Sequence, residues 1–199
     1  MGKFTSIRDQ AKHQFASCDE LIANSFSRDE LRFYVDCHNR IRHVTVGFDF
    51  SDADLKRLLG LDQLVSFSAR HFRGDFPHLT DVSASLLSLH PRMCAVELND
   101  CPNVSVEALD AIFNNKWIRW MNVGGERTTN QISLAFPRMG HVISLGLNNS
   151  SLTDEIVGEF IHLNALRRLN LHGCGISSSG IERIRELLPR CRISAEVAG

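Results

Sequence analysis

The stretch Leu166-Arg-Arg-Leu169-Asn-Leu171-His-Gly-Cys174-Gly-Ile176 follows the pattern L-x-x-L-x-L-x-x-C-x-L, with isoleucine in the last place. Moving back 24 residues gives Val142-Ile-Ser-Leu145-Gly-Leu147-Asn-Asn-Ser150-Ser-Leu152. Another 24 gives Ile118-Arg-Trp-Met121-Asn-Val123-Gly-Gly-Glu126-Arg-Thr128. A fixed period of this size indicates stacked structural units, so the chain of 199 residues is expected to form one continuous repeat domain.

Three earlier copies keep the phase of this pattern with weaker agreement. Each copy has one central apolar residue, and in order these are Val44, Phe67, Val96, Met121, Leu145 and Leu169. The one large excess in spacing, between Phe67 and Val96, predicts a longer loop at residues 70–79. A seventh, truncated copy ending at Cys191-Arg-Ile193 predicts a closing strand.

Between the copies, a hydroxyl residue recurs before apolar residues at helical spacing. The hydroxyl residues are Ser51, Thr80, Ser105, Thr129, Thr153 and Ser177. Each can accept a hydrogen bond from a backbone N–H of a first helical turn. The apolar stripe of each helix can then face the strand leucines. Every unit is therefore predicted to be a strand, a turn and a capped helix.

This alternation resembles the ribonuclease-inhibitor-like leucine-rich repeats, especially their cysteine-containing subtype, over residues 41–193. The resemblance implies an α/β fold: a right-handed solenoid, or horseshoe, with a parallel sheet on the concave side and helices on the convex side. It also implies that a cysteine at the ninth pattern position turns inward and bonds backbone groups of the turn. Cys101 and Cys174 match that position and Ser150 can partly substitute, whereas the remaining copies depart from it with Asp49, Phe72 and Glu126.

Residues 1–40 do not follow the repeat. We expect them to form an N-terminal cap, with residues 41–199 forming about six repeats and a truncated C-terminal strand, because a terminal repeat must have its apolar layer covered. Ile7, Ala11, Phe15 and Cys18 share a helical face, and Leu31, Tyr34 and Val35 suggest a second short apolar element. An independent functional domain is the alternative.

Charge and cysteine usage narrow the classes of partner and compartment. A net charge of −1 gives no global field that would attract nucleic acid or an anionic membrane. The six cysteines form no C-x-x-C pair, which favours reduced, packed thiols. Many charged residues near the start and the lack of any long apolar run predict a cytoplasmic protein. Membrane association would depend on acylation of Gly2 in Met-Gly-Lys-Phe-Thr-Ser.

Side chains alternate along a strand, so three rows should project from the concave sheet. The tryptophan row is His43, Ser66, Ala95, Trp120, Ser144 and Arg168; the asparagine row is Thr45, Ser68, Glu97, Asn122, Gly146 and Asn170; the histidine row is Gly47, Arg70, Asn99, Gly124, Asn148 and His172. The predicted partner-binding residues in these rows are Arg70, Glu97, Trp120, Asn122, Asn148, Arg168, Asn170 and His172.

Trp120 is the leading predicted contact residue, because tryptophan and arginine most often carry interface energy. Its alternative is packing within the protein over Gly146 or Gly124, and Arg167 with Arg168 are alternatively a solvated pair.

No catalytic, cofactor-binding or metal-binding residue is predicted. The histidines are scattered without ligand spacing and are expected in loops and at the surface, and no phosphate-binding loop motif is present. The predicted function is a non-catalytic protein–protein interaction module that binds a protein partner through the concave face. The alternative is an enzyme or enzyme regulator with a site at the groove edge, for instance His43 or His71 beside Asp49.

Overall fold

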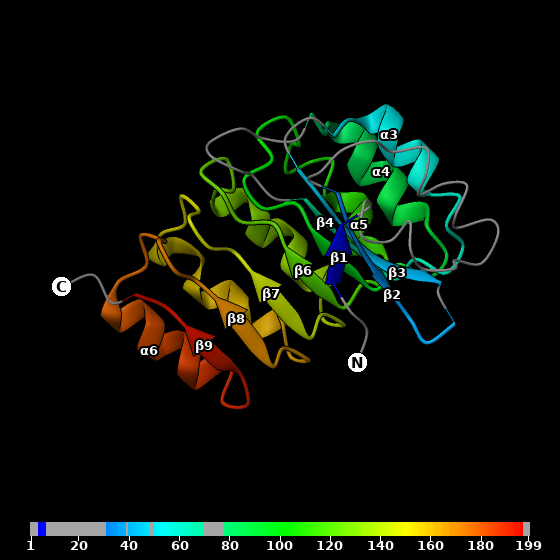
Figure 1. Cartoon of the computed structure of the whole chain (residues 1–199). Coiled ribbons are helices and arrows are strands. Elements are labelled where there is room, and N and C mark those ends of the chain that lie inside the picture. The colour runs from blue at the N-terminus through cyan, green and yellow to red at the C-terminus, as the bar shows by residue number, and fades with distance from the viewer. Residues whose placement is uncertain (1–3, 7–30, 39, 48–49, 70–77, 197–199) are drawn as a thin grey trace.

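The computed structural model describes residues 4–6, 31–38, 40–47, 50–69 and 78–196. Nine strands form one sheet in which spatial order follows chain order (Figure 1). The strands are β1 (Phe4–Ser6), β2 (Arg32–Val35), β3 (Ile41–Val46), β4 (Ser66–Ala69), β5 (Ala95–Glu97), β6 (Trp120–Asn122), β7 (Ser144–Gly146), β8 (Arg168–Asn170) and β9 (Arg192–Ser194).

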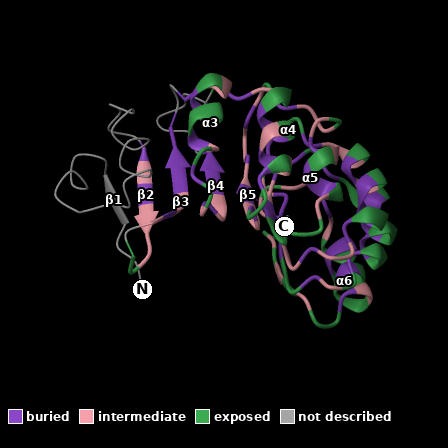
Figure 2. Cartoon of the chain, turned by 90° about the vertical axis from the view of Figure 1, so that its right-hand side faces the viewer, coloured by how far each residue is buried: buried purple, intermediate pink, exposed green. Residues whose placement is uncertain are grey.

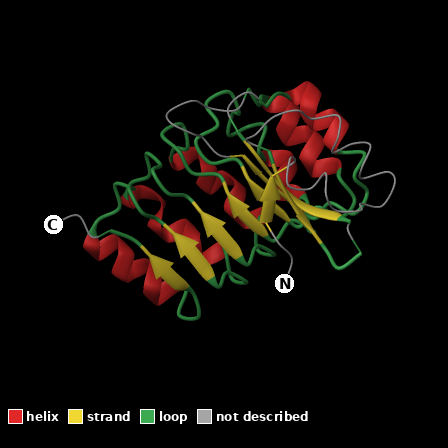
Figure 3. Cartoon of the chain, in the orientation of Figure 1, coloured by secondary structure: helices red, strands yellow, loops and turns green. Residues whose placement is uncertain are grey.

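Between the strands from β3 onward, helices return the chain to the start of the next strand. They are α3 (Asp52–Leu58), α4 (Asp81–Leu89), α5 (Asp110–Asn114), η1 (Asn130–Arg138), η2 (Asp154–His162) and α6 (Ser178–Leu187), where η denotes a 3₁₀ helix. They line the outer side of the strand array (Figure 3). Their outward-facing sides carry many exposed residues (Figure 2). The fold is therefore the predicted leucine-rich-repeat solenoid.

The predicted central residues of the repeats stand side by side across the parallel strands. Val44 pairs with Phe67, and the same register continues through Val96, Met121, Leu145 and Leu169 to Ile193. The six predicted residues are at most 3% exposed. A slip of one residue would have turned every one of them to the opposite face, so the predicted strand phase is confirmed.

The helices bury an aromatic layer against the strand leucines. Phe113, Phe136 and Phe160 occupy equivalent places in three successive units and are essentially inaccessible to solvent. The ring centroids of Phe136 and Phe160 lie 5.1 Å apart at an interplanar angle of 52°. This tilted aromatic contact stabilises the packing of one repeat on the next. The core is thus a column of stacked layers rather than a closed globule.

Two of the six predicted helices differ from an α-helix. η1 and η2 are 3₁₀ helices of nine residues. η1 contains Pro137, which cannot donate an i→i−4 hydrogen bond, and η2 contains Gly158, which lowers α-helical propensity. The prediction of helical segments holds at both places, and the apolar stripe of each is buried, although the helices are of the 3₁₀ type.

Capping also departs from the prediction at two units. Ser51, Thr80, Thr129 and Ser177 accept a backbone N–H of the first turn as expected. Thr153 precedes η2 without such a bond, since its hydroxyl instead accepts from Asn130 of the preceding unit at 2.8 Å. Ser105 accepts from the Ala108 N–H, but α5 begins only at Asp110, so Ser105 caps a turn.

The residue after four of the six hydroxyls links neighbouring units, a contact that sequence reasoning missed. Asp52 accepts from the backbone N–H of Thr80 at 3.0 Å, and Asp81, Asn130 and Asp154 accept in the same way from the next unit. Burial alone would raise the pKa of Asp52, but hydrogen bonds from Ser83 and Thr80 hold it below its ordinary value. These side chains form a ladder along the helix starts.

A second repeated feature is a backbone turn just after the strands. Asp100, Gly125, Asn149 and Gly173 occupy the same place in successive units and have φ values of 54°, 126°, 56° and 70°. Only glycine, asparagine and aspartate tolerate this region readily, so the residue types match the turn.

At the N-terminal side the sheet continues with antiparallel strands. β1 pairs with β2, and β2 pairs with β3. Leu31 and Phe33 are fully buried, so the second apolar element expected before residue 40 exists as β2. The expected helical face at Ile7 to Cys18 lies outside the described residues, and so do residues 70–77 of the longer loop expected at 70–79.

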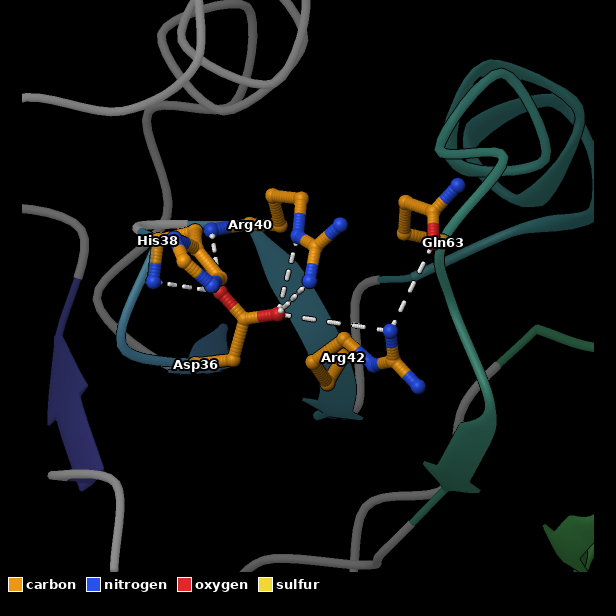
Figure 4. Close-up of polar contacts among 5 residues, drawn as sticks. All are labelled: Asp36, His38, Arg40, Arg42 and Gln63. Atoms are coloured by element: carbon orange, nitrogen blue, oxygen red, sulfur yellow. Dashed lines mark hydrogen bonds and ion pairs between the residues drawn. The ribbon is translucent and has the colours of Figure 1, made fainter.

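The turn between β2 and β3 is organised by Asp36 (Figure 4). Its carboxylate accepts from the backbone N–H of His38 and of Arg40, and pairs with the Arg40 guanidinium at 2.8 Å. Partial burial would raise the pKa of Asp36, but these hydrogen bonds and the arginine charge lower it to about 2. The Arg42 guanidinium lies 4.0 Å from the Asp36 carboxylate and donates to the Gln63 side chain at 3.5 Å, so it links the turn to the first repeat.

Candidate functional site

A groove of about 540 Å³ runs along the inner face of the sheet from β3 to β9. Five of the predicted contact residues line it: Glu97, Trp120, Asn122, Arg168 and Asn170. They come from three strands, β5, β6 and β8, and they face the same groove because the strands are parallel and in register. Their role as contact residues stays a prediction.

The half of the groove formed by β3 to β5 carries polar side chains that hydrogen-bond to one another across neighbouring strands. The ring nitrogens of His43 contact the hydroxyls of Ser66 at 2.7 Å and of Thr45 at 2.9 Å. Ser68 donates to one oxygen of Glu97, and Asn122 donates to the other at 3.3 Å. Thr45 and Ser68 are 3% and 2% exposed. These groups hold one another and leave little surface for a partner.

The half formed by β6 to β9 has the opposite character. Trp120, Ser144, Arg168 and Arg192 stand in one row on adjacent strands. Trp120 is 39% exposed, an unusual amount for so large an aromatic group, and both arginines are exposed. The tryptophan row therefore presents an aromatic ring, a short hydroxyl and two guanidinium groups to solvent.

The internal packing considered for Trp120 is not what the structure has. A Cβ built on Gly146 would overlap the side chain of Asn122, and one built on Gly124 would meet Asn148 and Asn99. The space in front of both glycines is thus filled by asparagine side chains and neighbouring backbone. Trp120 stands instead between Ala95 and Ser144, whose small side chains leave its ring accessible.

Of the other predicted contact residues, His172 and Asn148 do not line the groove. His172 lies past the end of β8, where its Nε2 contacts the Ser194 hydroxyl at 2.6 Å and its Nδ1 lies 3.7 Å from Glu196. Asn148 is half-buried beside Gly124. Arg70 lies outside the described residues.

Sequence reasoning missed two groove residues and one exposed aromatic residue. Arg192 and Ser194 line the groove from β9, and counting the truncated copy as a full member of each row would have found them. Trp117, 74% exposed, lies just before β6 on the rim and was not singled out. It is more exposed than Trp120, but it lines neither this groove nor the hollow beyond the strand ends.

The cysteine position of the repeat is only partly regular. The thiol of Cys174 donates to the Leu147 carbonyl at 3.0 Å, and that of Cys101 lies 3.9 Å from the Asn99 carbonyl. Burial raises the pKa of Cys101 to about 12, which makes it a packed, unreactive thiol. The Ser150 hydroxyl is buried but bonds no described residue, so the expected substitution for cysteine was wrong. In the unit with Glu126, Thr128 instead donates to the Val123 carbonyl at 2.7 Å.

The histidines are not all surface residues as expected. His90 is 5% exposed and its Nε2 contacts the Leu61 carbonyl of the preceding unit, and burial lowers its pKa. Asp49 and His71, the expected companions of His43 in a catalytic site, lie outside the described residues. Among the residues that are described, no three His, Cys, Asp or Glu side chains converge as a metal site would require.

A second hollow of about 980 Å³ lies beyond the strand ends, among the turns that follow β5 to β8. It is the larger of the two, but its walls are chiefly turn residues such as Asp100, Gly125 and Asn149, whose conformations the repeat itself requires. We place the candidate site in the groove because the exposed tryptophan and the two arginines gather there.

No helix in the described part of the chain combines the length and apolar character needed to cross a bilayer.

Comparison with known proteins yields similarity of structure only. No protein-family model and no curated protein matches the chain. It is similar to a leucine-rich-repeat protein of Leptospira interrogans, with 20% identity and a TM-score of 0.48 over 69% of this chain and 38% of that one. It is also similar to an internalin of Listeria monocytogenes, with 15% identity and a TM-score of 0.46 over 78% of this chain and 48% of that one. The chain thus spans less than half of either protein, and its fold is assigned from its own strand register.

Proposed function

We propose that this chain is a non-catalytic interaction module that binds a protein partner through the groove on its strand face. Repeat solenoids offer extended concave surfaces that commonly serve this purpose. The observation that carries the proposal is Trp120, which stays 39% exposed inside a groove and has small neighbours on both sides. A tryptophan in such a place supplies a rigid, apolar anchor with a donor at its edge.

The test compares the wild-type chain with the double variant Trp120→Ala/Arg168→Ala in affinity capture from lysate of its own cell, read by mass spectrometry. We expect a partner that is captured by the wild type and lost with the variant, while the thermal midpoint changes little because both side chains are solvent-accessible. The matched control is Trp117→Ala/Arg185→Ala, which removes the same residue types outside the groove. Equal loss with the control would argue against the groove as the binding surface.

A catalytic alternative rests on the contact of 2.7 Å between His43 Nδ1 and the Ser66 hydroxyl. A serine nucleophile needs a base whose other nitrogen is oriented by an acceptor, and Thr45 is the group that contacts His43 Nε2. We favour the binding function because a hydroxyl stabilises an imidazolium far less than a carboxylate would.

Three finer assignments are part of the proposal. We propose that residues 1–40 cap the first repeat, supported by β2 on the edge of β3 with Leu31 and Phe33 buried. We propose the cysteine-containing ribonuclease-inhibitor-like subtype, supported by the inward contact of Cys174. A cytoplasmic location, with membrane association only if Gly2 is acylated, is supported by the sequence composition.

A further inference from the structure

We propose that the partner segment recognised in the groove is acidic: two or more carboxylates next to an aromatic or aliphatic side chain. The carboxylates would pair with Arg168 and Arg192, and the apolar side chain would pack on Trp120. This inference rests on the proposed function and specifies the chemistry of the partner.

The first step is the placement of the two arginines. Arg168 and Arg192 are register partners on β8 and β9, so their side chains leave neighbouring parallel strands on the same face. Adjacent strands lie about 4.8 Å apart. Like charges that stand directly opposite each other destabilise a sheet. A bound anion would relieve this repulsion and give the arrangement a use.

The second step is that the charge of these arginines is not balanced. Within the described part of the chain, neither guanidinium has a carboxylate within ion-pairing distance, although Arg40, Arg57, Arg138 and Arg183 each have one. The acidic groove residue, Glu97, has both oxygens engaged by Ser68 and Asn122. It is on β5, three strands from Arg168 and four from Arg192. Glu196, which follows β9, lies 3.7 Å from His172, and no ion pair joins a described carboxylate to Arg168 or Arg192. Both guanidinium charges are therefore available to a ligand.

The third step is the spacing of the apolar anchor. Trp120 is on β6 and Arg168 on β8, so one strand, β7, separates them, and its residue in the same row is Ser144. The backbones of Trp120 and Arg168 are thus about 10 Å apart, and the small side chain of Ser144 lies between them. Guanidinium groups bind carboxylates in a planar, bidentate way. In an extended peptide, every second side chain points to the same face, and these side chains are spaced about 7 Å apart. A short acidic segment can reach both.

A protein segment fits this surface better than nucleic acid does. The Glu97 carboxylate lies in the neighbouring asparagine row and would repel a phosphate backbone that follows the groove. The chain as a whole has a net charge of −1, without the basic stripe that tracks several phosphates. Two arginines at one end instead suit a few carboxylates held in place by an apolar contact.

The test selects ligands from a displayed library of random peptides of about twelve residues on the full chain. Selected peptides are synthesised, and their affinities are measured by fluorescence anisotropy for the wild type, Arg168→Gln/Arg192→Gln and Trp120→Ala. The matched control is Arg183→Gln/Arg185→Gln, which removes two arginines from α6 on the helix side. A single-stranded oligonucleotide is included as a competitor.

We expect the selected peptides to be rich in aspartate and glutamate. Their affinity should fall about tenfold or more in the groove double variant and less than about twofold in the control. It should also weaken as salt is raised, because exposed ion pairs are screened. Their amide analogues, with Asn and Gln for Asp and Glu, should bind weakly.

Three results would overturn the inference in distinguishable ways. Peptides without acidic residues that lose affinity only in Trp120→Ala would refute the acidic partner and leave the proposed function standing. Peptides insensitive to both groove variants, or no enriched peptide at all, would count against both. Displacement of the peptides by the oligonucleotide at lower concentration than by acidic peptide would identify nucleic acid as the occupant.

Discussion

Leu169→Ala is the sharpest test of the strand assignment. It should lower the free energy of unfolding, whereas Arg168→Ala at the preceding, exposed position should leave it nearly unchanged. Leu169 is 2% exposed and lies between Leu145 and Ile193 in the column of central residues. The change removes three carbon groups from the core, each worth about 0.8 kcal/mol of transfer free energy. It also leaves a cavity whose lining relaxes incompletely, and the total for buried leucines is about 2.7–5 kcal/mol. Since Ile193 on one side is only half-buried, we expect about 3 kcal/mol.

The assay is urea unfolding followed by circular dichroism and tryptophan fluorescence. With a slope of about 2 kcal/mol per molar urea, the midpoint of Leu169→Ala should fall by about 1.5 M. Arg168→Ala should change the free energy of unfolding by about 0.5 kcal/mol or less, because its side chain is exposed. Coincident transitions by the two probes are required for the comparison. Equal losses for the two variants, or a loss below about 1 kcal/mol for Leu169→Ala, would refute the phase.

Three further outcomes follow from single positions. Gly146→Ala should destabilise the protein by about 1–3 kcal/mol in thermal or urea unfolding because the added methyl overlaps Asn122, whereas Gly158→Ala, with open space around it, should be neutral or slightly stabilising. The free energy of unfolding should decline as pH falls below about 4. The reason is that the pKa values of Asp36 and Asp52 are lowered in the folded state, so the unfolded chain takes up protons first. A free energy of unfolding that stays constant from pH 5 to pH 2 would contradict this. Asp36→Asn should remove up to about 1 kcal/mol at pH 7 and flatten that decline, since the pair with Arg40 is partly exposed.

The fold was predictable from the sequence because one short pattern repeats with little change in period. The apolar column through Met121, Leu145 and Leu169 needs no knowledge of long-range contacts, since each unit packs on its neighbour in the same register. The hydroxyl caps at Ser51 and Ser177 were predictable for the same reason: a local hydrogen bond depends on residues three positions apart.

What escaped prediction depends on contacts between units. The hydrogen bonds from Thr80 and Ser177 to aspartates of the preceding unit join residues 28 and 23 positions apart, and nothing in either local sequence marks them. The 3₁₀ geometry of η1 and η2 is associated with Pro137 and Gly158, which disfavour a regular α-helix. Whether a short helix tolerates such residues depends on its packing against neighbouring units, which the local sequence does not reveal. The burial of His90 was missed because its acceptor, the Leu61 carbonyl, belongs to the preceding unit.

The charge of the groove shows why composition misleads in a repeat protein. Summed along the chain, 22 basic and 23 acidic residues cancel and indicate no preference for an anion. The solenoid, however, brings residues one period apart to neighbouring strands about 4.8 Å apart, so Arg168 and Arg192 act as one site although 24 residues separate them. In a repeat protein, the charges to be added together are therefore those of residues at the same position in successive repeats, not those of residues adjacent in sequence. Along the tryptophan row the C-terminal end is basic with no acidic residue to compensate, and this is the physical basis for expecting an acidic partner there.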